Sequence, residues 1–136
     1  MGDFFIVINL QNSQWNTKEE LSFCLNIGVA LTATLKDPHK KKASYFDLSA
    51  ASREDIYLPR ERTLQKYRQG GWLGYVIKDH TNLADFVNEF KVDMETHILP
   101  KLEKLRSVKD CIEFYEQPGF SSEYLKKQVI QLNLKT

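Results

Sequence analysis

The chain has 136 residues, of which 42% are hydrophobic and 27% are charged, and its net charge is +1. This length predicts a single domain over residues 1–136, and the near-neutral charge favours neither a nucleic acid nor a membrane as the partner. Apolar runs fall far short of the roughly 20 residues of a membrane-spanning helix, and the N-terminus lacks the basic region of a signal peptide. We therefore expect a soluble, cytoplasmic protein with no membrane partner.

Two segments with alternating apolar residues at the N-terminus predict β-strands. In residues 3–12 the apolar side chains of one face fall on every second position, and residues 19–32 repeat this pattern from Leu21 to Leu31. The short polar connection between the segments contains Trp15. The two strands are therefore expected to pair as an antiparallel hairpin.

The second face of residues 19–32 carries small and polar side chains. Gly28 is unusual inside a strand, and we expect it to allow the close approach of a helix, a neighbouring element or another chain. Asn26 needs a hydrogen-bond partner there, and it becomes a candidate binding residue if water or a cleft lies against this face. Cys24 and Cys111 are expected to be packing residues outside any disulfide framework, which favours a reducing compartment.

An irregular region and a third strand follow the hairpin. Residues 35–71 contain several turn signals, but so long a loop without structure is uncommon in a compact domain. One short strand or helix is therefore expected within it, near Glu61 to Tyr67. Residues 72–78 then alternate as the third clear strand.

Helical spacing of apolar residues covers most of the chain after Asn82. Asn82 and Ser107 are each followed three residues later by an aspartate, which predicts the N-caps of two helices. Pro100 is expected to bend or end the first helix, and a last helix begins after Ser121 or Ser122. The order of strands and then helices predicts an α+β fold. In it, an antiparallel sheet of three to four strands in the N-terminal half is covered on one face by C-terminal helices.

Two motifs in the first strands resemble a bacterial family known only as a domain of unknown function. The residues that match are Leu10-Gln11-x-Ser13 and then Phe23-x-x-Asn26-x-Gly28-Val29. Residues 60–72 and 99–102 are similar to that family's Arg-containing stretch before a Trp-bearing strand and to its Leu-Pro-x-Leu helix. The resemblance spans residues 4–106 and implies a fold and a bacterial origin, with no established activity. Members often begin with a further helix and strand, so the resemblance also implies an exposed edge or core face that favours self-association.

The sequence contains no motif for a cofactor, a metal or a catalytic residue. It has no nucleotide-binding glycine pattern, no Cys-x-x-Cys and no His-Glu-x-x-His, and its three histidines are scattered. We therefore predict no cofactor and no metal. The leading interpretation is a non-catalytic binding or interaction domain, whose partner is another protein or a second copy of the chain in a homodimer.

Six polar, cationic or aromatic residues are the candidates for ligand binding. They are Asn26, Trp15, Arg60, Arg62, Trp72 and His80. One alternative function is a small hydrolase or transferase with a pocket near Asp79 and His80, where a strand hands over to a helix.

A second alternative is weak binding of single-stranded nucleic acid through residues 36–72. Nine basic and five acidic residues give the segment 35–71 a charge of +4, while nine acidic and five basic residues give the segment 79–116 a charge of −4. Aromatic residues interleave with the basic ones, as in proteins that bind single strands by charge and stacking. The five acidic residues weaken this reading, and a nucleic-acid partner is not the one we expect.

Overall fold

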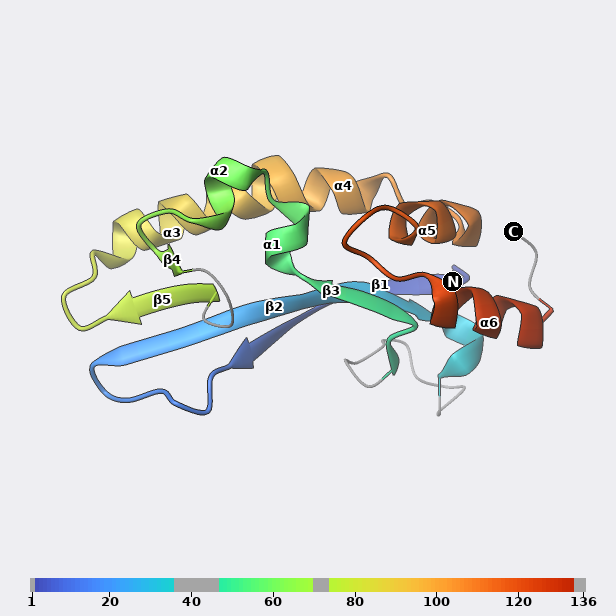
Figure 1. The fold of residues 1–136 in the computed structure, drawn as a ribbon, viewed down its shortest axis with the longest axis horizontal. Helices are drawn as coiled ribbons and strands as arrows, with labels where there is room; N and C mark the ends of the chain where they lie inside the picture. The colour runs from blue at the N-terminus through green and yellow to red at the C-terminus, as the bar shows by residue number, and fades with distance from the viewer. Residues whose placement is uncertain (1, 36–46, 70–73, 134–136) are drawn as a thin grey trace. The chain divides into compact units, whose positions relative to one another are not determined.

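The computed structural model of the chain describes residues 2–35, 47–69 and 74–133 (Figure 1). Its strands are β1 (Phe4–Asn12), β2 (Glu20–Leu31), β3 (Ala50–Arg53), β4 (Arg68–Gln69) and β5 (Gly74–Lys78). Its helices are η1 (Thr32–Thr34), α1 (Glu54–Tyr57), α2 (Arg60–Thr63), α3 (Leu83–Val92), η3 (Asp93–Ile98), α4 (Leu99–Glu103), α5 (Val108–Tyr115) and α6 (Glu123–Gln131). None of the helices in these ranges has both the length and the apolar character that crossing a membrane requires.

The strands form an antiparallel sheet in the order β1-β2-β5-β4, and β3 pairs with β2 off this path. In the ladder between β2 and β5, Phe23 lies opposite Tyr75. The sheet in the N-terminal half and the helices after it confirm the predicted α+β class. The predicted count of three to four strands is too low, since the sheet has five. The strands β3 and β4 have only four and two residues, which is too short for an alternating pattern to be visible.

The longer strands lie where the alternation predicts them. Residues 3–12 and 19–32 form β1 and β2, and the described part of residues 72–78 forms β5. Residues 72 and 73 lie outside the described residues. One short element was expected within residues 35–71, near residues 61–67. The structure has α2 there, ending at Thr63, and the described part of the segment also contains β3, α1 and β4, so the prediction of one element was too low.

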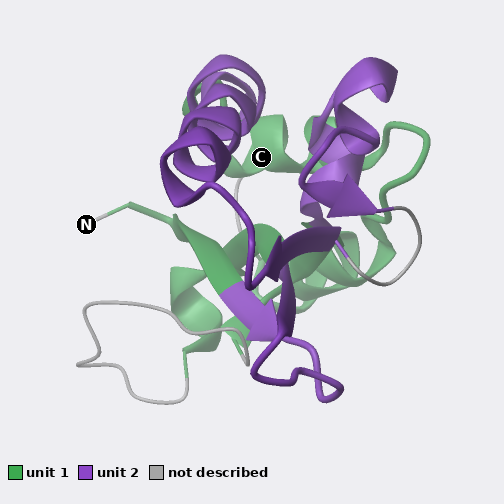
Figure 2. Cartoon of the chain, turned by 90° about the vertical axis from the view of Figure 1, so that its left-hand side faces the viewer, with its two compact units in different colours: residues 1–9, 26–52, 102–136 green, residues 10–25, 53–101 purple. Residues whose placement is uncertain are grey.

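The chain divides into two compact units (Figure 2). Unit 1 comprises residues 1–9, 26–52 and 102–136, and unit 2 comprises residues 10–25 and 53–101. The strands β1 and β2 each contribute residues to both units, and Figure 2 shows the change of unit along β1.

Unit 2 has an aromatic core between the sheet and α3. Phe23 on β2 stacks on Tyr75 of β5 with ring centroids 5.3 Å apart. Phe86 and Phe90, which lie one turn apart on α3, contact both of these rings at centroid distances of 5.1–6.2 Å. Within this unit, α3 therefore covers one face of the sheet, as the apolar stripes of the sequence predict.

The helix that begins at α3 confirms the predicted N-cap and differs from the prediction at Pro100. The side chain of Asn82 accepts a hydrogen bond from the backbone N–H of Asp85, which is the predicted N-cap. Before Pro100 the backbone changes to the π-helical segment η3, in which the N–H of Leu99 bonds to the carbonyl of Met94. Proline offers no N–H to the turn before it. The helix therefore does not end at Pro100; it passes through a wider turn and continues as α4.

Gly28 of β2, in unit 1, lies directly against the backbone of β3. A Cβ atom on Gly28 would lie 2.1 Å from the carbonyl oxygen of Ala50 and 2.9 Å from the Cα of Ala51, both in β3. The backbone of β3 thus occupies the space that a side chain would need. The expected close approach of a neighbouring element is confirmed, and the role of Gly28 is architectural.

Candidate functional site

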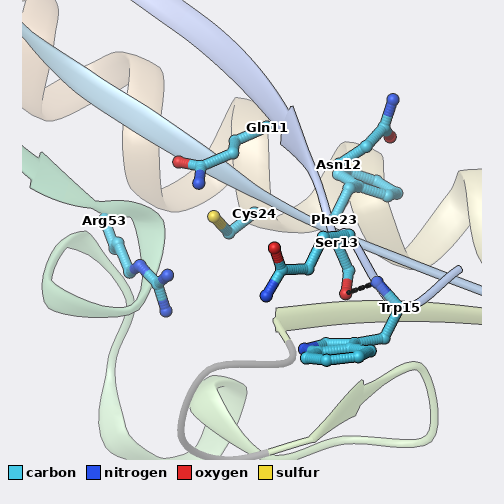
Figure 3. Close-up of a pocket in the computed structure, with 8 residues that line it drawn as sticks. Gln11, Asn12, Ser13, Trp15, Phe23, Cys24 and Arg53 are labelled. Carbon is cyan, nitrogen blue, oxygen red and sulfur yellow. Dashed lines mark hydrogen bonds between the residues drawn. The ribbon is translucent and has the colours of Figure 1, made fainter.

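A cavity of about 410 Å³ in unit 2 is the candidate site (Figure 3). Its lining residues come from the end of β1, from the connection to β2, from β2 itself and from the end of β3. They are Gln11, Asn12, Ser13, Gln14, Trp15, Phe23, Cys24 and Arg53. The volume lies within the range of roughly 300–1,000 Å³ that is typical of small-molecule sites.

Short polar side chains hold the connection between β1 and β2 in place. The backbone N–H of Ser13 bonds to the carbonyl of Ser22 at 3.0 Å, and the hydroxyl of Ser13 accepts the N–H of Trp15 at 3.1 Å. The side chain of Asn16 accepts the N–H of Ser22 at 2.8 Å and donates to its carbonyl at 3.2 Å. Serine and asparagine favour such local bonds. The connection is therefore ordered, while the Trp15 side chain that it carries remains 79% exposed.

The opposite side of the cavity is fixed by a buried ion pair next to Arg53. Arg53 ends β3 and is the N-cap residue of α1, and Glu54 follows it with only 1% of its surface exposed. The carboxylate of Glu54 accepts one hydrogen bond from Arg68 and one from the backbone N–H of Leu25, each at 2.8 Å. Because Leu25 directly follows Cys24, the bond from its N–H ties the start of α1 to the strand that lines the cavity, while the bond from Arg68 ties it to β4.

Gly74 is a second glycine that this arrangement requires. Its φ of +63° is unfavourable for other residues, and a Cβ there would lie 3.1 Å from the Glu54 carboxylate and 3.2 Å from the Cβ of Cys24. The first residue of β5 can therefore approach both the ion pair and the cavity wall only as glycine.

The cavity offers groups for recognition and lacks groups for acid–base chemistry. Burial raises the pKa of the Cys24 thiol above its ordinary value, so the thiol stays protonated and is a weak nucleophile. None of the lining residues in the described ranges is a histidine, an aspartate, a glutamate or a lysine. No hydroxyl or thiol of this wall therefore has a neighbouring general base among those residues.

A second polar cluster in unit 2 surrounds Asp93, which is fully buried in η3. Its carboxylate accepts hydrogen bonds from the Tyr75 hydroxyl at 2.7 Å and from Arg62 at 2.8 Å. Arg62 also pairs with the Glu89 carboxylate at 2.9 Å. Burial first, and then the bond to Asp93, raises the pKa of the Tyr75 hydroxyl well above its usual range. This cluster joins α2 to α3 and to the sheet, which is a structural role.

A third cluster lies at the start of α3. The Asp85 carboxylate accepts a hydrogen bond from Lys66 at 2.7 Å and one from the Tyr67 hydroxyl. These two bonds, that of Lys66 first, lower the pKa of the Asp85 carboxyl. Lys66 and Tyr67 also line another cavity of about 410 Å³, whose wall includes His80.

The candidate binding residues predicted from the sequence do not line one common site. Trp15 lines the candidate cavity, whereas His80 lines the cavity beside Lys66 and forms an exposed pair with Asp79 at 3.0 Å. Arg62 belongs to the Asp93 cluster, at the far end of α3 from His80.

Two further nominated residues lie away from the candidate cavity, and one lies outside the described residues. Arg60 is an exposed residue at the start of α2. Asn26, in unit 1, donates a hydrogen bond to the side chain of Asn9 on β1 at 3.4 Å. Trp72 is outside the described residues, as are residues 36–46 and 70–71 of the segment considered for nucleic acid.

Sequence reasoning missed Arg53 and Gln11 as members of one site. Gln11 could have been found from the sequence, because it belongs with Ser13 and Phe23 to the two motifs on which the family resemblance rests. All three of these residues line the cavity. Arg53 carried no such signal. Its place depends on the pairing of β3 with β2, which no local pattern predicts.

Comparisons with known proteins identify a family without a known activity. Neither the curated proteins nor the solved structures contain a significant match. Within the described residues, no group of three or more histidine, cysteine, aspartate or glutamate side chains could hold a metal ion. A family model described as a domain of unknown function (DUF4304) matches residues 1–104. This match covers well over half of the chain, and the protein therefore belongs to the DUF4304 family.

Proposed function

We propose that this protein is a non-catalytic binding domain and that the cavity of unit 2 is its ligand site. One observation carries the proposal. The described wall combines a guanidinium, side-chain amides and the exposed indole of Trp15, which recognise ligands, with none of the acid–base residues that a reaction needs.

The buried surroundings of this wall support a binding role over a catalytic one. A binding site needs groups held in fixed positions, and here Glu54 fixes the backbone next to Arg53 while Ser13 and Asn16 fix the connection that carries Trp15. The thiol of Cys24 faces the same wall in its protonated form. The alternative of a hydrolase or transferase near Asp79 and His80 has less support, because both of these side chains are more than two-thirds exposed.

The test is a fragment screen by NMR on the isotope-labelled full chain. We expect fragments to shift the amide signals of residues 11–15 and 23–24 together, and we expect Trp15→Ala to abolish those shifts. The matched control is Tyr124→Ala, which removes another exposed aromatic ring, at α6. Fragments that bind only at other residues, or ester and phosphate model substrates whose turnover is lost in His80→Ala, would overturn the proposal.

We further propose a second copy of this chain as a partner, bound along β1. β1 is the terminal strand in the sheet order of the described residues, and its Ile6 and Ile8 side chains are 38% and 40% exposed. The strand carries no charge, so antiparallel pairing of two copies brings no like charges together.

Light scattering during size-exclusion chromatography tests this partner at several protein concentrations. We expect a dimer that Ile8→Lys dissociates, while Ile130→Lys, at a residue that is 78% exposed on α6, leaves it intact. A monomer at all concentrations contradicts the proposal. The cytoplasmic location and the bacterial origin stay predictions.

A further inference from the structure

We propose that the cavity of unit 2 takes a small carboxylate that carries a flat aromatic ring. This inference rests on the proposed function, because it names the ligand class of the same site. It follows from the charges of the wall, from the placement of an aromatic ring and from its size.

The charge of the wall points to a single anionic group. Arg53 is the one charged side chain among the described lining residues. A guanidinium presents two parallel N–H donors that match the two oxygens of a carboxylate. A polyphosphate would draw on several cations, and a cationic ligand or a divalent metal would need carboxylates. The described wall offers neither arrangement.

An aromatic ring of the wall lies across the cavity from that charge. Figure 3 shows Arg53 on one side and Trp15 on the other. The indole of Trp15 is largely exposed, so its face is accessible to a second ring. Offset stacking on an indole favours flat aromatic groups. The acid group and the ring of the ligand must therefore lie at opposite ends of one molecule.

The middle of the cavity and its volume limit the ligand further. Gln11 points into the space beside Arg53 in Figure 3, and its side-chain amide can both donate and accept hydrogen bonds. This amide suits a polar substituent between the ring and the acid. A volume of about 410 Å³ holds a molecule of one or two fused rings and excludes a folded macromolecule.

The experiment compares naphthalene-2-carboxylate with its neutral analogue, naphthalene-2-carboxamide, by NMR titration of the full chain. We expect the carboxylate to bind at residues 11–15 and 23–24 about tenfold or more tightly than the carboxamide, since a charge-assisted hydrogen bond replaces a neutral one. Cyclohexanecarboxylate, which keeps the acid without the ring, and inorganic phosphate are expected to bind more weakly than the aromatic acid.

Variants assign the effect to the two ends of the cavity. Arg53→Met is expected to remove the preference for the acid, and Trp15→Ala is expected to weaken both naphthalene probes alike. Arg60→Met is the matched control, since it removes an exposed arginine that does not line the cavity. If Arg53→Met perturbs the fold, Arg53→Lys keeps the charge, loses the paired donors and is expected to give an intermediate affinity.

The outcomes separate this inference from the proposed function. Equal affinity for acid and carboxamide at the cavity residues, or an acid affinity that Arg53→Met leaves unchanged, overturns the ligand class while the binding site stands. A failure of both probes to shift the cavity residues also overturns the ligand class. In that case the broader fragment screen decides whether the cavity binds anything.

Discussion

The buried pair of Glu54 and Arg68 gives the sharpest quantitative prediction, through the substitution Glu54→Gln. The side chains of this pair are only 1% and 3% exposed, and the carboxylate also accepts the backbone N–H of Leu25. Glutamine has nearly the same volume but turns an N–H₂ group toward one of the two donors. The substitution therefore leaves the Arg68 charge buried without its counter-ion.

The structure sets the size of this effect. Removing one partner of a buried ion pair costs about 3–5 kcal/mol of the free energy of unfolding, whereas an exposed pair is worth about 0–1 kcal/mol. Arg68 keeps two other contacts, one over the ring of Tyr75 at 4.5 Å and one to the carbonyl of Thr63 at 3.3 Å. These contacts continue to compensate part of the charge. We therefore expect a loss near the lower end, about 3 kcal/mol.

Urea denaturation followed by circular dichroism measures this loss. With a slope of about 2 kcal/mol per molar, the midpoint should fall by about 1.5 M. Glu116→Gln is the matched control, because the pair of Glu116 with Lys126 has 44–47% of each side chain exposed and should lose less than about 1 kcal/mol. Adding Arg68→Met to Glu54→Gln removes the orphaned charge, so the double variant should lose less than the sum of the single ones. A loss below about 1 kcal/mol for Glu54→Gln would refute the reasoning.

Three further predictions concern single residues. Gly28→Ala should lower the free energy of unfolding, measured in urea, by about 1–3 kcal/mol because the new Cβ would collide with β3. Gly2→Ala is the control and should be neutral, since a Cβ at Gly2 meets nothing closer than 3.9 Å. Asp85 has a lowered pKa, so its stabilising effect is present above about pH 4 and lost as the pH falls through that lowered pKa. Asp85→Asn should therefore flatten the acid side of the profile of melting temperature against pH, and an unchanged profile contradicts this. Burial raises the pKa of Cys111 to about 12, so mass spectrometry at about pH 9 should find this thiol alkylated only in the urea-unfolded chain.

The longer elements of the fold were predictable because their patterns repeat several times within one element. β1 and β2 have nine and twelve residues, enough for alternation to be visible, and α3 shows its apolar stripe over three turns. β3, β4 and α1 are too short for any period. β3 and β4 form because β2 and β5 offer them partners, and the start of α1 is held by the bonds of Glu54 to Leu25 and Arg68; both are tertiary effects.

The charges of the chain show a different limit of sequence reasoning. The excess of basic residues in the segment 35–71 suggested a basic surface for single-stranded nucleic acid as an alternative function. In unit 2 three of the basic residues instead pair with acidic ones, and these pairs are Arg62 with Asp93, Lys66 with Asp85 and Arg68 with Glu54. A sum of charges carries no distances, so it cannot distinguish a solvated patch from a set of internal pairs.

The candidate site was only partly predictable for a similar reason. Trp15 was among the candidate binding residues of the sequence, and it lines the cavity. Gln11 is only four residues from Trp15 and belongs to the same stretch of chain, whereas Arg53 joins the site through the pairing of β3 with β2. The small face of β2 was correctly interpreted as a place of close approach, but the sequence left open what approaches Gly28, and the structure places β3 there.

The π-helical segment η3 bears on how the length of this chain can vary. A π-helical turn inside an α-helix accommodates one residue more than the same turn in α-helical form, while the helix on either side keeps its direction. Asp93–Ile98 therefore has the form of a one-residue insertion that the helix has absorbed. Deleting the exposed Thr96 should restore an uninterrupted α-helix and be tolerated. Deleting Asn88, an exposed residue of α3, should instead rotate the apolar stripe of that helix out of register. Relatives whose lengths differ by one residue are accordingly expected to differ within this turn.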